Sequence, residues 1–361
     1  MKNPFNPTFG DVPRLFLEKD GRESAEGLAY IIAQSDFSRS FFITGVRGSG
    51  KTVFMTRVSE VLAQNEDFVC IDLLNRENIL ANLVNQLYHE VKSKIAKALD
   101  SIESISISNF SITKHQDEMV VEVALDRLMT EIQKANKKVL ITIDEVNDSP
   151  EIQNFAQIYS SLKRKKYPIF VLMTGLPDLV LDLQNNTKLT YLLRSEKIEM
   201  EPLDNLSVLK NYQQVFQADQ VVLSKMAQMV KGYSYGFQLL GYLAYQYLEN
   251  NGNGTLSFAD LEEINRDYQL YLFENAYQKI FEGLSKVDIQ YLIAVKDHTK
   301  LEDVCQILGK DKVFVSQYRR RAISRKLIIP AGRGYVDYVL PYFGEFINQI
   351  QNPDSIFYLG I

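Results

Sequence analysis

The chain has 361 residues, which is enough for two or three domains with a sizeable core in the largest one. Hydrophobic residues at 46% and charged residues at 24% match an ordinary soluble globular protein, and a net charge of -5 argues against a protein coated in nucleic acid. No stretch approaches the roughly 18 apolar residues of a membrane span, and the first residues lack the apolar core of a signal peptide, so we expect a cytoplasmic protein.

Hydrophobic periodicity predicts alternating strands and helices in the first half of the chain. In chain order, the predicted elements are a strand at 39–44, a glycine-rich loop, a helix from about 51 to 62, a strand at 68–73, a helix at 77–98, a hairpin or edge strand at 104–113, a helix at about 117–135, and strands at 138–145 and 168–175. This alternation predicts an α/β fold with a parallel sheet covered by helices on both faces, beside which the N-terminal tail packs.

The second half of the chain is predicted to be mainly helical. Helices are expected from 205 to 248, a break at 250–254 (NNGNG), and a long helix from about 257 to 281 that ends at Gly283. Ser285 starts the next helix, and Asp288 three residues later completes a variant of the capping box.

The segment GVRGSGKT at 45–52 fits the pattern G-x-x-x-x-G-K-[ST] and lies between a predicted strand and a predicted helix. Its glycines permit a tight turn in which backbone N–H groups point at phosphate oxygens. Lys51 can reach the β- and γ-phosphates, and the Thr52 hydroxyl can bind Mg²⁺. The predicted nucleotide-binding residues are therefore Gly45, Val46, Arg47, Gly48, Ser49, Gly50, Lys51 and Thr52.

A second motif, LITIDEVND at 140–148, ends a predicted central strand with two acidic residues. Asp144 can hold Mg²⁺ opposite Thr52, and Glu145 can orient or deprotonate the water that attacks the γ-phosphate. Thr174, at the end of the next strand, lies beside this pair if the two strands are neighbours. It either contacts the γ-phosphate or is simply satisfied by the turn at Gly175. Arg194 either completes the site of a neighbouring subunit or is a surface arginine at a helix end.

The order of these motifs resembles the AAA+ ATPases, in particular the prokaryotic branch related to origin-recognition ATPases and to signal-transduction ATPases with numerous domains. The segments that carry the resemblance are GVRGSGKT, ITIDEVND, MTGLPDL, RSEKIEMEPL, GYSYGFQLLGY and the N-terminal NPFNPTFGDVPRLFLEKDGRE. The resemblance covers nearly the whole chain. Its phosphate-loop and acid-pair motifs are specific for nucleotide binding and say nothing about a biological process.

The resemblance assigns a role to each matching residue. It makes Asp144 the Mg²⁺ aspartate, Glu145 the catalytic base, Thr174 the first sensor and Arg194 a finger that acts in trans. It also implies a nucleotide-binding domain at 1–204, a helical lid with a linker helix at 205–282, and a further domain at 283–361. The family usually places an arginine or a Gly-x-Pro turn in the lid, where this chain has GYSY at 232–235. ATP binding is therefore better supported than turnover.

Residues 285–343 are predicted to form three short helices and a hairpin, which is the order of a winged helix. Between residues 310 and 333, eight lysines and arginines stand against one aspartate, a charge of +7, so the remainder of the chain carries -12. A helical wheel places Gln317, Arg320, Arg321 and Ser324 on one side of the third helix, with Val315, Tyr318 and Ala322 opposite. Arginine and glutamine can read bases in a major groove, and Arg333 at the wing tip can contact phosphate.

Together these features predict an ATP-binding AAA+ switch with Mg²⁺-dependent hydrolysis, a winged helix that contacts duplex DNA, and ATP-dependent homo-oligomers. The alternative is a signalling or scaffold ATPase whose winged helix binds a protein partner. A motor that threads a polymer is disfavoured because no aromatic pore loop is found.

Overall fold

The computed structural model describes residues 2–8, 10–17, 23–94, 118–177, 195–252 and 254–360. Its chain forms two compact units. The sheet unit comprises Glu18–Thr44 and Lys51–Glu199, and the helical unit comprises Met1–Leu17, Gly45–Gly50 and Met200–Ile361. The hairpin predicted at 104–113 and the candidate finger Arg194 lie outside the described residues.

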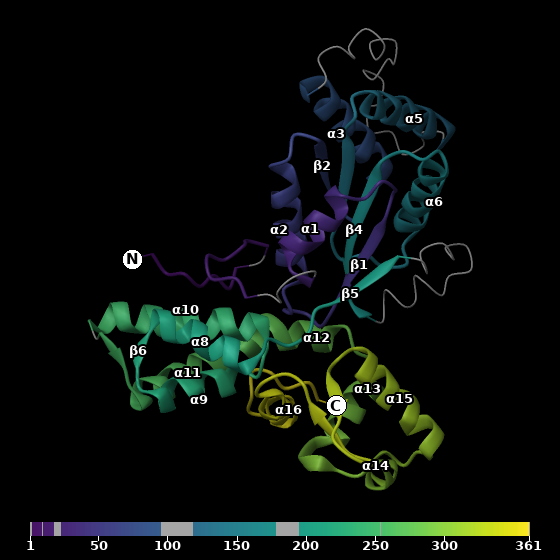
Figure 1. Ribbon diagram of the computed structural model, residues 1–361. Coiled ribbons are helices and arrows are strands. Elements are labelled where there is room, and N and C mark those ends of the chain that lie inside the picture. The colour runs from purple at the N-terminus through teal and green to yellow at the C-terminus, as the bar shows by residue number, and fades with distance from the viewer. Residues whose placement is uncertain are drawn as a thin grey trace. The chain divides into compact units, whose positions relative to one another are not determined.

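The sheet unit is built on five parallel strands in the order β2-β3-β4-β1-β5 (Figure 1). Its described elements are α1 (Ala25–Ala33), β1 (Ser40–Thr44), α2 (Lys51–Ala63), β2 (Phe68–Leu73), α3 (Ile79–Lys94), α5 (Glu118–Lys134), β3 (Lys138–Ile143), α6 (Pro150–Arg164), β4 (Ile169–Gly175) and β5 (Glu196–Glu199). The predicted parallel sheet is confirmed. Strands β1 to β4 match apolar runs of the sequence, whereas β5, with the sequence EKIE, is mostly exposed.

Helices cover both faces of this sheet because its central strands are apolar on both sides. The strands β3 and β4 have no exposed residue, and successive side chains of a strand point to opposite faces. Helices α3, α5 and α6 share one apolar core with alternate residues such as Val139, Ile141 and Ile143. Helix α2 contacts β1 to β4 but contributes nothing to that core, so α2 and its neighbour α1 cover the opposite face.

The helical unit has a single large apolar core that runs from the phosphate loop to the C-terminal helix. Its elements are α8 (Asn205–Val215), β6 (Gln217–Ala218), α9 (Gln220–Val230), α10 (Ser234–Asn251), β7 (Thr255–Leu256), α11 (Phe258–Leu272), the π-helical turn η5 (Phe273–Tyr277), α12 (Gln278–Glu282), α13 (Lys286–Ala294), the 3₁₀ turn η6 (Lys296–His298), α14 (Leu301–Leu308), α15 (Lys312–Ser324), β8 (Ile328–Pro330), β9 (Val336–Tyr338) and α16 (Phe343–Gln351).

The N-terminal segment belongs to the helical unit, and its predicted packing beside the sheet stays a prediction. The Phe5 ring is 2% exposed and stacks on Phe216 with ring centroids 5.7 Å apart. It also meets Phe237 of α10 edge to face, and it lies so close to Gly241 that a β-carbon there would collide with it. The sequence marks Phe5 as apolar but contains no local signal for a partner more than 200 residues away.

The C-terminal part of this unit has the predicted order of three helices and a hairpin. Helices α13, α14 and α15 contact one another, and β8 pairs with β9 in antiparallel register. This arrangement fits a winged helix. The capping box is confirmed: Asp288 N–H donates to the Ser285 hydroxyl, and the Asp288 carboxylate accepts from the Ser285 N–H.

The long helix predicted at 257–281 is interrupted. It runs as α11, then as the π-helical turn η5, then as α12, and it ends at Gly283 as predicted. A π turn inserts one extra residue into a helix, and such insertions are rare and concentrate at functional positions. The buried Phe273 and Tyr277 are the first and last residues of this turn.

Candidate functional site

The carboxyl ends of two neighbouring strands bring the predicted site residues of the sheet unit together. Strand β4 pairs with β3, so Thr174 in β4 lies beside Asp144, which directly follows β3. The Thr174 hydroxyl, fully buried, donates a short hydrogen bond to the Asp144 carboxylate. The Thr52 hydroxyl, in the first turn of α2, donates to the same carboxylate at 2.9 Å. The predicted proximity of these three residues is confirmed.

Glu145 occupies a backbone conformation that directs its N–H group inward. Its φ angle is +52°, in the left-handed region that non-glycine residues adopt uncommonly. The N–H group of Glu145 lies 3.1 Å from both the Asp144 carboxylate and the Thr174 hydroxyl oxygen. The side chain of Glu145 is exposed, so it is accessible to a water molecule.

Asn75 is a residue of this edge that the sequence interpretation missed. Its amide Nδ2 donates to the carbonyl oxygen of Glu145 at 2.8 Å and lies 3.4 Å from Asn147 Oδ1. It thereby helps to hold Glu145 in its unusual conformation. The available signal was its place: Asn75 comes two residues after β2, and polar residues just past parallel strands gather at one edge of the sheet.

The side chains at this edge suit a magnesium ion. Mg²⁺ prefers oxygen ligands and usually keeps several waters, so one or two protein ligands suffice. The Thr52 hydroxyl and the Asp144 carboxylate are already held together by a hydrogen bond and offer hard oxygen donors. No group of three or more His, Cys, Asp or Glu side chains that could hold a metal ion occurs among the described residues.

The glycine-rich loop at 45–50 belongs to the helical unit, where the start of α10 holds two of its carbonyl groups. The Tyr233 hydroxyl donates to the Arg47 carbonyl at 2.9 Å, and the backbone N–H of Tyr235 donates to the Gly48 carbonyl at 3.0 Å. Gly48 and Gly50 adopt φ angles of +77° and +88°, which explains why glycine is needed at both positions. Within the loop, the Ser49 N–H group donates to the Val46 carbonyl at 3.2 Å, so the loop conformation is fixed both from within and from α10.

The tyrosines of GYSYGF were noticed as part of the family resemblance but received no role from the sequence. Tyr233 is 4% exposed, and burial raises the pKa of its hydroxyl well above the usual range, so it remains a proton donor. Where the family usually has an arginine or a Gly-x-Pro turn, this chain has a tyrosine that contacts the loop backbone.

The predicted DNA-contacting residues of α15 and the hairpin have different surroundings. Gln317, Arg320 and Arg333 are exposed, and Ser324 is partly buried. Arg321 instead donates to the buried carboxylate of Asp288 at 2.8 Å and lies over the ring of Tyr318. Its guanidinium therefore has a partner within the protein. Val315 and Ala322 are buried on the opposite side, as the helical wheel predicts.

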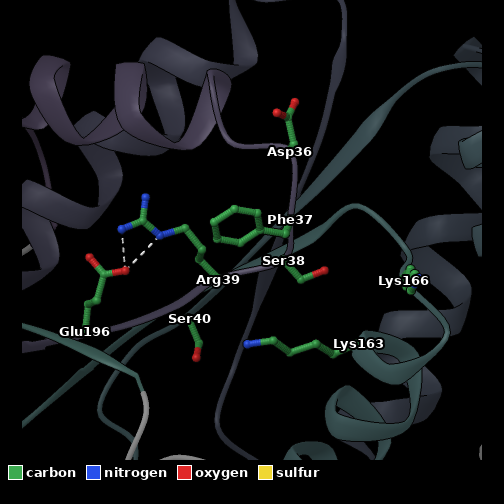
Figure 2. Close-up of a pocket in the computed structure, with 8 residues that line it drawn as sticks. All are labelled: Asp36, Phe37, Ser38, Arg39, Ser40, Lys163, Lys166 and Glu196. Atoms are coloured by element: carbon green, nitrogen blue, oxygen red, sulfur yellow. Dashed lines mark hydrogen bonds and ion pairs between the residues drawn. The ribbon is translucent and has the colours of Figure 1, made fainter.

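A cavity of about 550 Å³ lies at the amino-terminal edge of the sheet, the edge opposite Asp144 (Figure 2). Arg39 forms an ion pair with Glu196 there, and the Ser38 and Ser40 hydroxyls are hydrogen-bonded within the protein. The lysines at its rim come from the end of α6, where cations complement the helix dipole. Ligands of open α/β sheets bind at the carboxyl edge, so we assign this cavity no role in the site.

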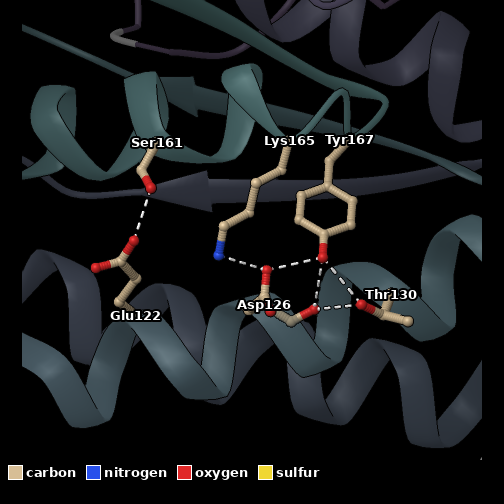
Figure 3. Close-up of polar contacts among 6 residues, drawn as sticks. All are labelled: Glu122, Asp126, Thr130, Ser161, Lys165 and Tyr167. Atoms are coloured by element: carbon tan, nitrogen blue, oxygen red, sulfur yellow. Dashed lines mark hydrogen bonds and ion pairs between the residues drawn. The ribbon is translucent and has the colours of Figure 1, made fainter.

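A polar network at the end of α6 joins this helix region to α5 and does not belong to the carboxyl-edge site (Figure 3). The Asp126 carboxylate of α5 accepts from Lys165 at 2.7 Å and from the Tyr167 hydroxyl at 2.8 Å. The Tyr167 hydroxyl also lies 2.9 Å from the Thr130 hydroxyl. The hydrogen bond from Lys165 lowers the pKa of Asp126. These contacts fasten α5 to the segment that precedes β4.

The fold and the carboxyl-edge residues together define a P-loop ATPase of the AAA+ type. The strand before the loop, β1, is separated from β3 and its acidic pair by β4, which carries Thr174. Residues 29–218 match the family model of an ATPase domain predominantly from Archaea, which is more than half of the chain. The chain belongs to this family. Residues 274–347 match a second model, a domain of unknown function, DUF8462.

Solved structures share this fold over nearly their whole length. A Walker-type ATPase of Pyrococcus abyssi is 13% identical with a TM-score of 0.60, covering 93% of this chain and 96% of its own. The ORC2 protein of Aeropyrum pernix, in ADPNP–ADP complexes, is 14% identical with a TM-score of 0.56, and the match covers 92% of this chain and 97% of the ORC2 chain. Cdc6p from Pyrobaculum aerophilum is 12% identical with a TM-score of 0.50, and the match covers 95% of this chain and 96% of the Cdc6p chain.

No match was found among curated proteins. The described helices also include none whose length and apolar character would suffice to cross a bilayer.

Proposed function

We propose that this protein is an ATP-dependent molecular switch. ATP binds to the loop at 45–52, Mg²⁺ is held by Thr52 and Asp144, and slow hydrolysis resets the switch. The observation that carries this proposal is the convergence of the Thr52 and Thr174 hydroxyls on the Asp144 carboxylate at the carboxyl edge of the sheet. The sequence motif and the family support the same conclusion.

Each site residue has a defined task in the proposed reaction. Lys51 contacts the β- and γ-phosphates, and bound Mg²⁺ neutralises the charge that develops on them. Glu145 orients or deprotonates the attacking water, and its side chain is exposed while its backbone N–H group donates to the Asp144 carboxylate. Thr174 keeps Asp144 oriented as a ligand. Arg194 would act in trans in an ATP-dependent homo-oligomer, a role supported by its place in the sequence.

We further propose that the C-terminal winged helix contacts duplex DNA. The charge of +7 between residues 310 and 333 supports this proposal. So does the exposure of Gln317 and Arg320 on α15 and of Arg333 in the turn between β8 and β9. An exposed helix face with arginine and glutamine suits a major groove, and an exposed arginine on the hairpin suits a phosphate.

A specific observation favours the alternative that the winged helix binds a protein partner. Large apolar side chains are exposed beside the basic ones: Val313 of α15 is 78% exposed, Ile307 of α14 is 62% exposed and Ile329 of β8 is 48% exposed. Arg321 is engaged by Asp288. A surface with exposed apolar residues is typical of protein interfaces.

Salt dependence distinguishes these two partners. We would titrate a fluorescent random-sequence duplex with the protein, with and without ATP·Mg²⁺, at several salt concentrations. Phosphate contacts release counterions, so DNA affinity should fall log-linearly with salt. The variant Arg320→Ala/Arg333→Ala should bind more weakly, with a salt slope lower by about two. The control Lys92→Ala/Lys134→Ala removes the same charge from exposed positions of the sheet unit. If both variants reduce the affinity for the duplex equally, or if the protein does not bind the duplex even at low salt, the protein-partner alternative is favoured.

The ATP site is tested separately by calorimetry and phosphate release. Lys51→Ala should abolish ATP binding because the phosphates lose their cation. Glu145→Gln should keep binding within a few-fold and reduce hydrolysis by at least about a hundredfold, which is typical for loss of a general base. Normal ATP binding by Lys51→Ala would show that the site has been assigned to the wrong loop.

A further inference from the structure

Tyr233 lies between the phosphate loop and the C-terminal part of the helical unit. Its hydroxyl donates to the Arg47 carbonyl at 2.9 Å, and its ring fills the space next to Gly48 so fully that a β-carbon on Gly48 would collide with it. Tyr235 donates its backbone N–H group to the Gly48 carbonyl, and its β-carbon also lies next to Gly48. A movement of the loop therefore changes the contacts of the Tyr233 side chain directly.

From Tyr233, a chain of aromatic rings continues toward the β8–β9 hairpin. The Tyr233 and Tyr277 ring centroids are 6.5 Å apart, and Tyr277 meets Phe343 edge to face at 5.4 Å. Phe343 in turn meets Tyr338 of β9 edge to face at 5.2 Å. Tyr233, Tyr277 and Phe343 are almost completely buried. Because buried side chains are close-packed, displacement of one ring has to be accommodated by the next.

Hydrogen bonds anchor the far end of this chain to the winged helix. The Tyr338 hydroxyl donates to the Leu292 carbonyl of α13 at 2.6 Å, and Lys231, at the end of α9, donates to the Tyr338 carbonyl at 2.5 Å. The Tyr277 hydroxyl donates to the Pro341 carbonyl, just after the hairpin. The hairpin is therefore tied to the same rings that contact the phosphate loop.

The middle of the chain of rings coincides with the one irregular turn of the long helix. Tyr277 is the last residue of the π-helical turn η5. Returning a π turn to α-helical geometry would change the register of the helix by one residue, so this turn is a candidate two-state element. Coupling between sites requires an element of this kind, whose equilibrium both sites can bias.

We propose that Tyr233 is a positioning residue for the phosphate loop, and that the rings of Tyr233, Tyr277, Phe343 and Tyr338 couple the loop to the β8–β9 hairpin. The inference rests on the proposed ATP site, since a ligand on the loop supplies the signal. The hydroxyl of Tyr233 fixes the Arg47 carbonyl and thereby the conformation of the loop. A loop that moves when ATP binds shifts Tyr233, and the packed rings transmit the shift to the hairpin.

The absence of tryptophan from the chain makes a direct test possible. Ile329→Trp places a single tryptophan at a half-exposed position of β8, opposite Asp337. ATP·Mg²⁺ is titrated while tryptophan fluorescence is recorded, and calorimetry measures ATP binding independently of the reporter. We expect ATP to change the emission of this protein with the same Kd as calorimetry gives.

Three tyrosine-to-phenylalanine substitutions in this reporter protein then separate the roles of the tyrosines. Tyr233→Phe should weaken ATP binding about three- to tenfold, as for one hydrogen bond, and should reduce the fluorescence change at saturating ATP by at least half. The control Tyr271→Phe makes the same chemical change at an exposed ring of α11 outside this chain of rings, so both readouts should stay within twofold. Tyr277→Phe should leave the Kd unchanged and reduce the fluorescence change.

The outcomes separate the inference from the proposed function. If calorimetry detects no ATP binding, the ATP site itself is wrong and the coupling falls with it. If ATP binds but the reporter does not respond, or if Tyr233→Phe and Tyr277→Phe respond like the parent, the coupling is overturned and the ATP site stands. Circular dichroism of each variant verifies that the unit is folded.

Discussion

Asp144 depends on hydrogen bonds from residues of two different elements, α2 and β4. Thr52 belongs to the recognisable motif, whereas Thr174 is identified only by its place at the end of a strand. The short carboxylate side chain therefore has a fixed orientation before any ligand arrives. In such a preorganised site, a metal ligand needs little rearrangement when the ion binds. The loop glycines perform a comparable task for the backbone, because they permit a geometry that other residues resist.

Gly48 offers the sharpest residue-scale prediction. An alanine there must adopt a left-handed φ angle, which costs about 1–2 kcal/mol, and its β-carbon would meet the Tyr233 ring. We expect Gly48→Ala to abolish ATP binding, as measured by calorimetry, and to lower the free energy of unfolding by more than 1–2 kcal/mol.

Gly252, at the end of α10, provides the matched control. It has a similar φ angle of +65°, but a β-carbon there meets nothing within 4 Å. Gly252→Ala should therefore cost about 1 kcal/mol and leave ATP binding intact. Equal effects of the two substitutions on ATP affinity would show that the close approach of Tyr233 is irrelevant.

Two helices of this protein, α13 and α5, are each joined to a neighbouring segment by one carboxylate. Asp288 caps α13 and also accepts a hydrogen bond from Arg321 of α15, so one buried carboxylate joins two helices of the C-terminal part of the helical unit. A substitution of Arg321 would consequently reduce stability as well as remove surface charge, which is why Arg320 and Arg333 are the better probes of DNA binding. Asp126 plays the corresponding part between α5 and the residues before β4.

The Asp126 network predicts a pH-dependent contribution to stability. The pKa of Asp126 is lower in the folded protein, chiefly through the hydrogen bond from Lys165, so the contribution is present above the unfolded value of about 3.9. It is lost as the pH falls through the lower folded value. Both side chains are more than a third exposed, at 38% and 41%, so solvent limits the effect to at most about 1 kcal/mol.

Urea unfolding of the wild type, Asp126→Asn, Lys165→Met and the double variant measures this contribution. The coupling energy of the cycle should be measurable at pH 7 and should vanish toward pH 2–3, the range in which carboxylates are protonated. A coupling energy that is independent of pH would exclude the ion pair as its source.

The strands and the phosphate loop could be predicted from the sequence. Contacts between residues far apart in the sequence could not. Strand positions and the phosphate loop follow from local patterns, because a buried parallel strand and a glycine-rich turn each have a composition of their own. The partner of Phe5 lies in α8 and α10, and the partner of Arg321 lies in α13. The hydroxyl of Tyr233 reaches a loop almost 190 residues earlier. None of these contacts produces a periodic pattern of apolar residues in the sequence. The π turn at Tyr277 produces no such pattern either.

At the scale of the whole molecule, the chain passes between its two units several times. The N-terminal segment and the phosphate loop both belong to the helical unit, although the sequence around them builds the sheet. Each unit has its own apolar core. Their stabilities should therefore respond separately to substitutions in one core.

Phe5→Ala tests this separation. Removing a buried phenylalanine typically costs 3–5 kcal/mol, and here the loss falls on the aromatic cluster of Phe216 and Phe237. Hydrogen exchange should show faster exchange of amides in α8 and α10, with the amides of β1, β3 and β4 unchanged. Phe37→Ala, at a ring that is 71% exposed in the sheet unit, should change neither set. Equal loss of protection in both units would mean that the two cores unfold as one.

The position of β1 in the sheet has a consequence for the nascent chain. Strand β1 is made early but lies between β4 and β5, so its partner β4 is complete only when Gly175 has been translated and its partner β5 only when Glu199 has been translated. The loop that follows β1 waits longer still, because Tyr233 and Tyr235 come later in the chain. Pairing over such sequence separations is slow, and an apolar strand remains uncovered meanwhile. Translation therefore supplies the strands of the sheet before the residues of α10 that hold the phosphate loop.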